Sequence, residues 1–182
     1  MLIAVSYALA EGTLNNWAVL YLTEFKLFSP TQATQVLSAF WSALAIGRMG
    51  MAALLIIIPA SWVWIGFPLL VIVSFILLPT ITPHNTVAAT WIYIIAGLGC
   101  SAAFPLSIRF AIQAFDDHAE FMASFMTAAL MLGICTGSYA LGPLQKQIPL
   151  QTLLQASALW PVLMIGLSLW TLLNKKSAST SA

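Results

Sequence analysis

Long apolar segments separated by short polar connections run through the whole chain. Six of them reach the length of about 20 mainly apolar residues that a helix needs to cross the hydrocarbon core of a bilayer. Their apolar runs are continuous and do not alternate, which excludes a transmembrane β-barrel. The pattern therefore predicts an all-α membrane domain over residues 1–173. The predicted helices cover approximately Leu2–Thr23, Ala33–Ile58, Trp62–Ile81, Val87–Ala111, Phe121–Gly142 and Leu153–Leu173.

Residues 174–182 form a polar end that we expect to be a disordered cytoplasmic tail. Six crossings place both termini on one side of the membrane. The positive-inside rule then favours a cytoplasmic C-terminus, because three cations flank that face and two flank the other. The three are Arg109, Lys175 and Lys176, and the two are Lys26 and Lys146.

Composition places the chain in lipid and removes several classes of function. Apolar residues make up 61% of the 182 residues and charged residues only 6%, whereas soluble domains carry about 25% charged residues. A net charge of +1 with scattered cations argues against a nucleic-acid partner. Cys100 and Cys135 stand alone in apolar runs, so neither a disulfide framework nor a metal site is expected, and no cofactor is implied. The bilayer is the first partner.

Two stretches about 85 residues apart resemble each other, in the second and the fifth predicted helix. The same offset relates the first helix to the fourth and the third to the sixth, so three helices would occur twice. Because three is odd, the two units would have opposite orientations, as in many secondary transporters. Small residues at helical spacing are also a general packing solution in membranes, which leaves chance as the alternative. The stretches are Ser38-Ala39-Phe40 with Gly47 and Gly50, and Ala123-Ser124-Phe125 with Gly133 and Gly137.

The first predicted helix carries a polar stripe formed by Tyr7, Glu11 and Asn15, spaced four residues apart. A carboxylate at this depth costs at least about 2.5 to 3.5 kcal/mol, so it normally faces a protein interior or a water-filled cavity. The stripe offers a phenol, a titratable carboxyl and an amide for binding a solute or a proton. The alternative is a protonated or paired Glu11 that serves packing alone.

Arg48 is the other ionisable residue well inside a predicted helix. Glu11 and Arg48 both lie roughly 14 Å from the same membrane face at 1.5 Å per residue. They could therefore form an ion pair that acts as a gate when Glu11 takes up a proton or a solute. The competing interpretation is that Arg48 extends toward the cytoplasmic face.

Small residues and a proline mark possible hinges in the fourth and fifth predicted helices. Gly97 and Gly99 allow close helix approach, and Pro105 removes a backbone hydrogen bond and lets the helix bend. Gly133 and Gly137 suit close packing in the same way.

Polar and aromatic side chains next to the stripe extend the candidate site. Asn16 and Trp17 follow Asn15 directly, and Trp41 lies deep in the second helix. An indole that faces a cavity can stack on a sugar ring, although packing in the core or against lipid is the alternative. Tryptophans near helix ends are expected to be interfacial anchors; these are Trp62, Trp64, Trp91 and Trp170.

Three motifs together resemble the carboxy-terminal six-helix half of a major facilitator superfamily transporter, and within it the fucose-permease-like, sugar-transporting branch. The resemblance implies half of a twelve-helix carrier around a central cavity. The partner would be an amino-terminal six-helix half, or a second copy of the chain. The motifs are Tyr7-Ala-Leu-Ala-Glu11-Gly12-Thr-Leu-Asn-Asn-Trp17 with Tyr21-Leu22, then Gly47-Arg48-Met49-Gly50, then Gly97-Leu-Gly99 to Phe104-Pro105.

These observations predict proton-coupled secondary transport of a small polar solute, with a sugar as the leading candidate, in the inner membrane of a bacterium. The alternative is a non-catalytic membrane subunit or an inactive transporter fragment. An intramembrane serine protease would need a histidine base beside a buried serine. Because His84 and His118 both lie in predicted loops, we expect no enzymatic activity.

Overall fold

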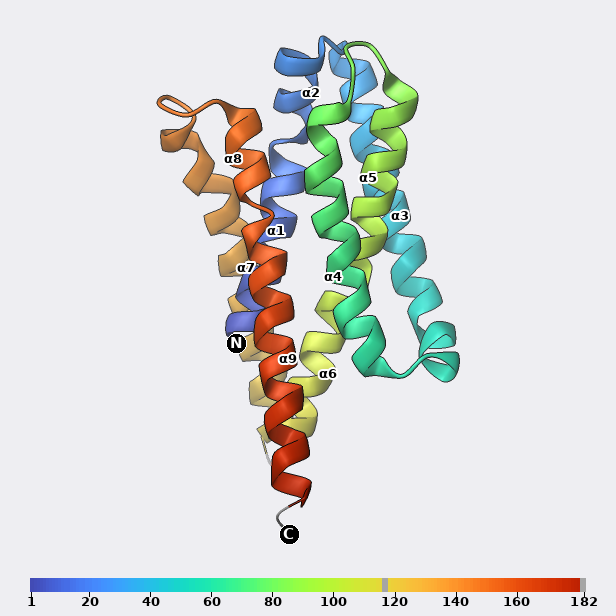
Figure 1. The fold of residues 1–182 in the computed structure, drawn as a ribbon, viewed down its shortest axis with the longest axis vertical. Coiled ribbons are helices and arrows are strands. Elements are labelled where there is room, and N and C mark those ends of the chain that lie inside the picture. The colour runs from blue at the N-terminus through green and yellow to red at the C-terminus, as the bar shows by residue number, and fades with distance from the viewer. Residues whose placement is uncertain (116–117, 181–182) are drawn as a thin grey trace.

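The computed structural model describes residues 1–115 and 118–180, and its regular structure there is helical (Figure 1). The all-α prediction is confirmed for this part of the chain. The bounds of the elements are α1 Leu2–Asn16, α2 Ala18–Lys26, α3 Pro30–Ile57, α4 Ala60–Leu77, the 3₁₀ helix η1 Leu78–Thr80, α5 Thr86–Ser101, α6 Ala103–Ala114, α7 Ala119–Leu144, α8 Leu150–Ala156 and α9 Leu159–Thr180.

Five helical stretches within the described residues are long and apolar enough to cross a membrane, so the chain is a multi-pass membrane protein. They are Pro30–Ile57, Ala60–Thr80, Thr86–Ala114, Ala119–Leu144 and Leu150–Thr171. The first predicted segment, Leu2–Thr23, is not among these five. That segment is divided at Trp17 into α1 and α2, of 15 and 9 residues. Each is shorter than the roughly 20 residues of a single crossing.

Helix ends follow local capping chemistry, which hydropathy alone does not describe. α3 begins at Pro30, three residues before the predicted start, because Ser29 and Gln32 form a reciprocal capping box. Asn85 caps α5 by accepting from the Ala88 amide at 3.0 Å. Sequence hydropathy locates the apolar centre of each helix, and these caps set where the helix starts.

The predicted disordered tail differs from the structure over most of its length. α9 continues to Thr180, so residues 174–180 extend the last helix, while residues 181–182 lie outside the described part of the chain. Neither glycine nor proline follows Gly166. The backbone therefore meets no helix-breaking residue there.

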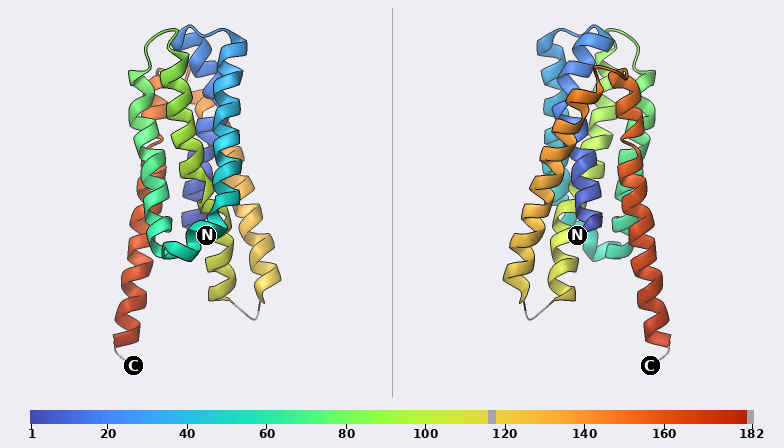
Figure 2. Two further views of the ribbon diagram at one scale, coloured as in Figure 1. Left: turned by 90° about the vertical axis from the view of Figure 1, so that its right-hand side faces the viewer. Right: turned by 90° about the vertical axis from the view of Figure 1, so that its left-hand side faces the viewer.

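The helices form an antiparallel bundle in which α1 and α5 occupy central positions (Figures 1 and 2). α1, α4 and α7 run in one direction, and α3, α5 and α9 run in the other. The most extensive contacts join α1 to α7 and α3 to α5, followed by α4 with α5 and α1 with α9. A central α1 places its polar residues inside the bundle.

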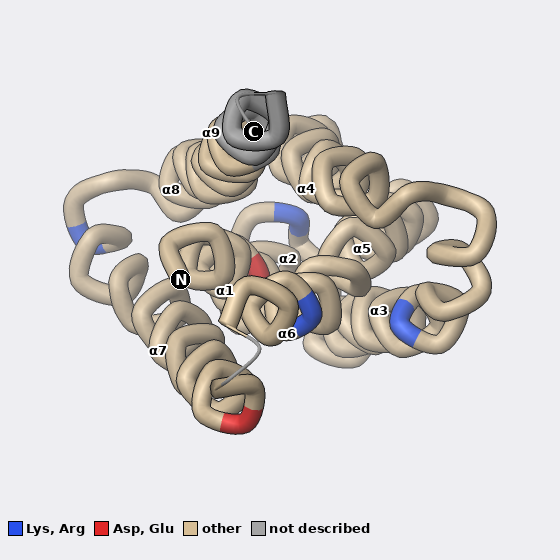
Figure 3. The backbone as a smooth tube through the Cα atoms, turned by 90° about the horizontal axis from the view of Figure 1, so that it is seen from below, with Lys and Arg blue, Asp and Glu red and all other residues tan. Residues whose placement is uncertain are grey.

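The outside of the bundle is apolar, as a lipid solvent requires. Charged positions along the described backbone are few and scattered (Figure 3). Large apolar side chains cover the outer faces instead. Examples are Ile56, 87% exposed, Ile57, 81% exposed, Trp62, 74% exposed, and Leu132, 68% exposed.

Candidate functional site

The predicted polar stripe lies inside the bundle. Tyr7, Glu11 and Asn15 all belong to α1, and their exposed fractions are 3%, 3% and 6%. Burial of an ionisable side chain without a partner is expensive. The stripe therefore has the burial that a functional site within a membrane protein requires, and the contacts of each member decide what it can do.

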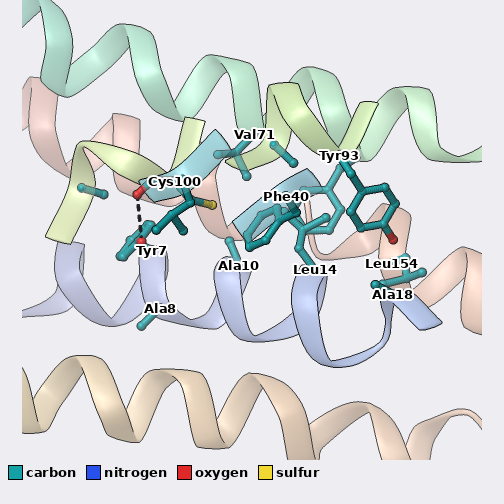
Figure 4. Close-up of a cluster of buried hydrophobic side chains, with 14 of the residues drawn as sticks. Tyr7, Ala8, Ala10, Leu14, Ala18, Phe40, Val71, Tyr93, Cys100 and Leu154 are labelled. Atoms are coloured by element: carbon teal, nitrogen blue, oxygen red, sulfur yellow. Dashed lines mark hydrogen bonds between the residues drawn. The ribbon is translucent and has the colours of Figure 1, made fainter. Parts of the chain in front are cut away.

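Tyr7 binds the chain where α5 ends. Its hydroxyl donates to the carbonyl oxygen of Cys100 at 2.9 Å, and both residues are buried (Figure 4). The last carbonyls of a helix lack amide donors of their own helix. Pro105 adds to this shortage, because it has no N–H for the carbonyl of Ser101. Tyr7 thus caps α5 from a neighbouring helix, at the break where α6 begins.

Glu11 and Asn15 form no side-chain hydrogen bond with the described residues. The side-chain hydrogen bonds from α1 are made by Ser6, Tyr7, Thr13 and Asn16. Tyr7 is close enough to Glu11 to interact with it. Because the Tyr7 proton is directed to the Cys100 carbonyl, however, the phenol oxygen can only accept toward Glu11. A hydrogen bond between Glu11 and Tyr7 must therefore be donated by a protonated carboxyl.

The predicted ion pair between Glu11 and Arg48 is not formed in this conformation. Arg48 is exposed, and its guanidinium carbon lies 5.4 Å from the centroid of the Phe104 ring. Its neighbour Gly47 takes the interface position against Ser101 of α5. Arg48 lies against Phe104 of α6, in the segment that directly follows Ser101, and its charge is close enough to act on Glu11 without forming an ion pair. Equal depth in the membrane was therefore not sufficient to predict direct pairing.

Asn16 and Trp17 attach the end of α1 to α7. The Asn16 amide donates to the Ser138 hydroxyl, and the Trp17 indole nitrogen donates to the Ser138 carbonyl oxygen at 2.9 Å. Thr13 adds a longer contact of 3.5 Å to the Gly137 carbonyl oxygen. These side chains were predicted to bind a solute, and in this structure they bind α7. Sequence reasoning did not assign a role to Thr13 or Ser138.

Trp41 lies apart from the stripe. It is 46% exposed on α3 and packs edge-on against Phe40, with ring centroids 5.4 Å apart. Phe40 itself is fully buried. The indole of Trp41 therefore lies on the surface of the bundle and not beside Glu11.

The predicted small residues form close contacts between helices. A Cβ at Gly133 would lie 2.5 Å from the Ala8 Cβ, and one at Gly137 would lie 2.6 Å from the Leu9 carbonyl oxygen. Gly99 meets Val71 of α4 at 2.8 Å in the same way. Such contacts leave no room for a side chain.

A second pair of glycines makes equally close contacts with backbone carbonyls. A Cβ at Gly12 would lie 2.5 Å from the Ile134 carbonyl oxygen of α7, and one at Gly97 would overlap the Phe40 carbonyl oxygen of α3. Sequence reasoning gave Gly12 no packing role. Its distance of 85 residues from Gly97, the offset of the suspected repeat, was the signal that could have found it.

Two cavities in the described part of the molecule have linings that do not include Glu11. One of about 400 Å³ lies among α1, α4, α6, α7 and α9, and one of about 260 Å³ lies among α1, α7, α8 and α9. The stripe is therefore enclosed by packed helices in this conformation. Within the described residues, no group of three or more histidine, cysteine or acidic side chains is placed to hold a metal ion.

Fold and site together define a multi-pass α-helical membrane protein with a buried carboxyl on a divided helix. Comparisons with protein-family models, with curated proteins and with solved structures give no match. The family suggested by the sequence motifs is therefore a matter of proposal.

Proposed function

We propose that the chain is one six-helix unit of a secondary transporter of the major facilitator type, with a 3+3 inverted repeat and no enzymatic activity. It would move a small polar solute, with a sugar as the leading candidate, coupled to protons through Glu11. The observation that carries the proposal is a carboxyl that is 3% exposed on a divided central helix. Discontinuous helices that carry ionisable groups are typical of transporter sites at the middle of the membrane.

Helix packing supports the repeat. If α1 with α2, α3 and α4 correspond to α5 with α6, α7, and α8 with α9, then the contact of α1 with α7 corresponds to that of α5 with α3. These are the two most extensive contacts in the bundle. The contact of α4 with α5 likewise corresponds to that of α9 with α1. Equivalent helices also run in opposite directions (Figure 1), as an inverted repeat requires.

The positions of the breaks and of the closest contacts support the same correspondence. α1 gives way to α2 at Trp17, and α5 gives way to α6 at Ala102, 85 residues later. Gly12 and Gly97 are also 85 residues apart, and each approaches a carbonyl oxygen of the long helix that belongs to the other unit. Chance packing of small residues explains two such coincidences at the same offset less well than it would explain one.

Glu11 supplies the chemistry for proton coupling. A charged carboxylate could accept from Tyr7 only if the phenol released the Cys100 carbonyl, whereas a protonated carboxyl can donate to the Tyr7 oxygen while that bond remains. Uptake and release of a proton would therefore change the contacts of Glu11 with its own helix. Asn15, one turn further on and equally free of side-chain bonds, would bind a hydroxyl-bearing solute.

A second six-helix unit would complete the central cavity, either as an amino-terminal half or as a second copy of the chain. Neither cavity in this chain reaches Glu11, which fits a site that is completed by a partner. The cation distribution supports a cytoplasmic C-terminus in a bacterial inner membrane. Lys26 and Lys146 lie at one end of the bundle, and Arg109 lies toward the other.

Transport in proteoliposomes tests the proposal. The chain would be reconstituted alone and with an amino-terminal six-helix half, and accumulation of radiolabelled hexoses, including fucose, would be followed under an imposed pH gradient. Glu11→Gln should abolish gradient-driven accumulation while leaving solute exchange. Glu24→Gln is the matched control, because Glu24 is an exposed carboxylate on the other piece of the same divided segment. Accumulation that still depends on the pH gradient in Glu11→Gln would refute the coupling role.

The alternative is a membrane subunit without transport activity of its own, or an inactive fragment. If the chain acts alone, the closed packing around Glu11 favours this alternative, because a solute could not reach the carboxyl. Absence of solute exchange with either form of the reconstituted chain would select this alternative.

A further inference from the structure

Two predicted site residues outside the polar stripe share one outer face of α3. Trp41 and Arg48 are spaced i, i+7, which returns a helix to nearly the same direction, and both are exposed. Ala45 lies between them on this face and is exposed as well. The indole and the guanidinium therefore stand on either side of a small residue, with their Cα atoms about 10 Å apart along the helix.

Arg48 is too deep in α3 to be an interfacial anchor. α3 is a candidate span, and Arg48 lies about 14 Å before its end at Ile57, at 1.5 Å per residue. The guanidinium carbon stays within 5.4 Å of the Phe104 ring centroid, beside the break between α5 and α6. Among the described residues, no carboxylate forms an ion pair with it. Because an exposed cation at this depth is expensive toward lipid, we expect this face of α3 to line a polar space.

The two side chains define what that space could bind. A planar guanidinium forms two parallel hydrogen bonds with a carboxylate, and an exposed indole can stack on the apolar side of a sugar ring. The charge of Arg48 is also close enough to act on Glu11. A negatively charged solute would therefore balance Arg48 while Glu11 carries its proton, and solute and proton would cross together without net charge.

We propose that this outer face of α3 binds sugar acids, with the carboxylate on Arg48 and the sugar ring against Trp41. The inference rests on the proposed transport function and narrows its solute from a sugar to a hexuronate. A neutral hexose could accept hydrogen bonds from Arg48 but would leave the cation without a counterion. A hexuronate supplies both the ring and the counterion.

Binding of a matched pair of sugars tests the role of Arg48. Tritiated galacturonate and galactose share a ring and differ in the carboxylate, and each would be titrated onto the full chain in nanodiscs. Galacturonate should bind more tightly, and Arg48→Gln should weaken its binding by about tenfold to a hundredfold while leaving galactose unchanged. Arg48→Lys should give an intermediate loss, because it keeps the charge and not the paired hydrogen bonds. Arg109→Gln is the matched control, since Arg109 is exposed on α6 and should affect neither sugar.

The role of Trp41 is tested with the same two sugars. Trp41→Ala should weaken both by a similar factor, because the ring is common to them. Trp62→Ala should weaken neither, since Trp62 is 74% exposed on α4, away from this face.

Three results would overturn the proposal: no binding of galacturonate, equal affinity of the unmodified chain for the two sugars, or an equal loss of both in Arg48→Gln. The last would assign Arg48 to a carboxylate of the second six-helix unit or to packing against Phe104. Proton-driven accumulation of hexoses alongside any of these would leave the proposed transport function standing. Galacturonate binding that depends on Arg48, without transport of either sugar, would instead retain the site and refute the transport function.

Discussion

The two divided helices have similar architecture and opposite chemistry. α1 with α2 and α5 with α6 each break at positions 85 residues apart, and each approaches a long neighbouring helix through a glycine. The side chains at matching positions differ. At the offset of the proposed repeat, 85 residues, Tyr7, Glu11 and Asn15 of α1 are aligned with Ile92, Ala96 and Cys100 of α5.

This difference distinguishes the frame, meaning the close backbone contacts at the glycines, from the site, meaning the polar stripe of α1. Close backbone contact is present in both units and serves the assembly of the bundle. Polar groups are concentrated in the first unit, which is where a membrane protein would hold a proton or a solute. Substitutions that act on the frame should therefore affect both units alike, and those that act on the stripe should affect only the first.

Gly12→Ala and Gly97→Ala should have the largest effect on stability. Each places a methyl group against a backbone carbonyl, of Ile134 or Phe40 respectively, that cannot move as a side chain would. Overpacking of this kind costs about 3 kcal/mol. Thermal unfolding in detergent should show similar losses for the two variants.

Gly50→Ala is the matched control for both glycine substitutions. A Cβ at Gly50 of α3 meets no other atom within 4 Å. The added helix propensity should therefore stabilise the chain by about 0.5 to 1 kcal/mol. A large loss at Gly12 with none at Gly97 would contradict the structural equivalence of the two units.

Tyr7→Phe should be the next most damaging change. It removes the one side-chain donor that the described residues give to the buried Cys100 carbonyl oxygen, at a cost of about 1 to 3 kcal/mol. Thermal unfolding measures the loss. Tyr139→Phe is the control, because Tyr139 is 78% exposed and its substitution should be neutral. A neutral Tyr7→Phe would mean that the α5 end does not need its cap.

Trp17→Phe should cost less, about 1 kcal/mol, because its indole hydrogen bond to Ser138 is only partly buried. The change keeps the aromatic ring and removes the donor that fastens α1 to α7. Hydrogen exchange of the α2 amides should become faster, whereas α5 and α6 should be unaffected. Equal acceleration in both divided helices would show that Trp17 stabilises the whole bundle and not its own unit.

Much of the fold follows from hydropathy, and its breaks follow from local chemistry. Lipid as solvent makes a long apolar run a helix with few alternatives, which is why five of the six predicted segments are candidate spans. The break at Ala102 lies in the segment where Pro105 predicts a hinge. The break at Trp17 has no proline near it. It follows the weak helix formers Asn15 and Asn16, and it depends on bonds to α7 that hydropathy does not contain.

The site was predictable in part for a similar reason. Spacing along one helix placed Tyr7, Glu11 and Asn15 together, and burial agrees with that placement. Contacts between helices depend on rotation about each helix axis, which depth does not determine. Arg48 therefore lies over Phe104 and does not form an ion pair with Glu11.

Glu11→Ala should have the smallest effect on stability and the clearest effect on function. In the proposed repeat Glu11 is aligned with Ala96, which is 1% exposed in α5, so we expect alanine to be accepted at position 11. Removing a buried carboxyl without a donor offsets the packing that is lost, and thermal unfolding should change by less than about 1 kcal/mol. Proton-driven accumulation in proteoliposomes should disappear. A loss of stability as large as that of Gly12→Ala would instead assign Glu11 to the frame, and the asymmetry between the two divided helices would then have no functional meaning.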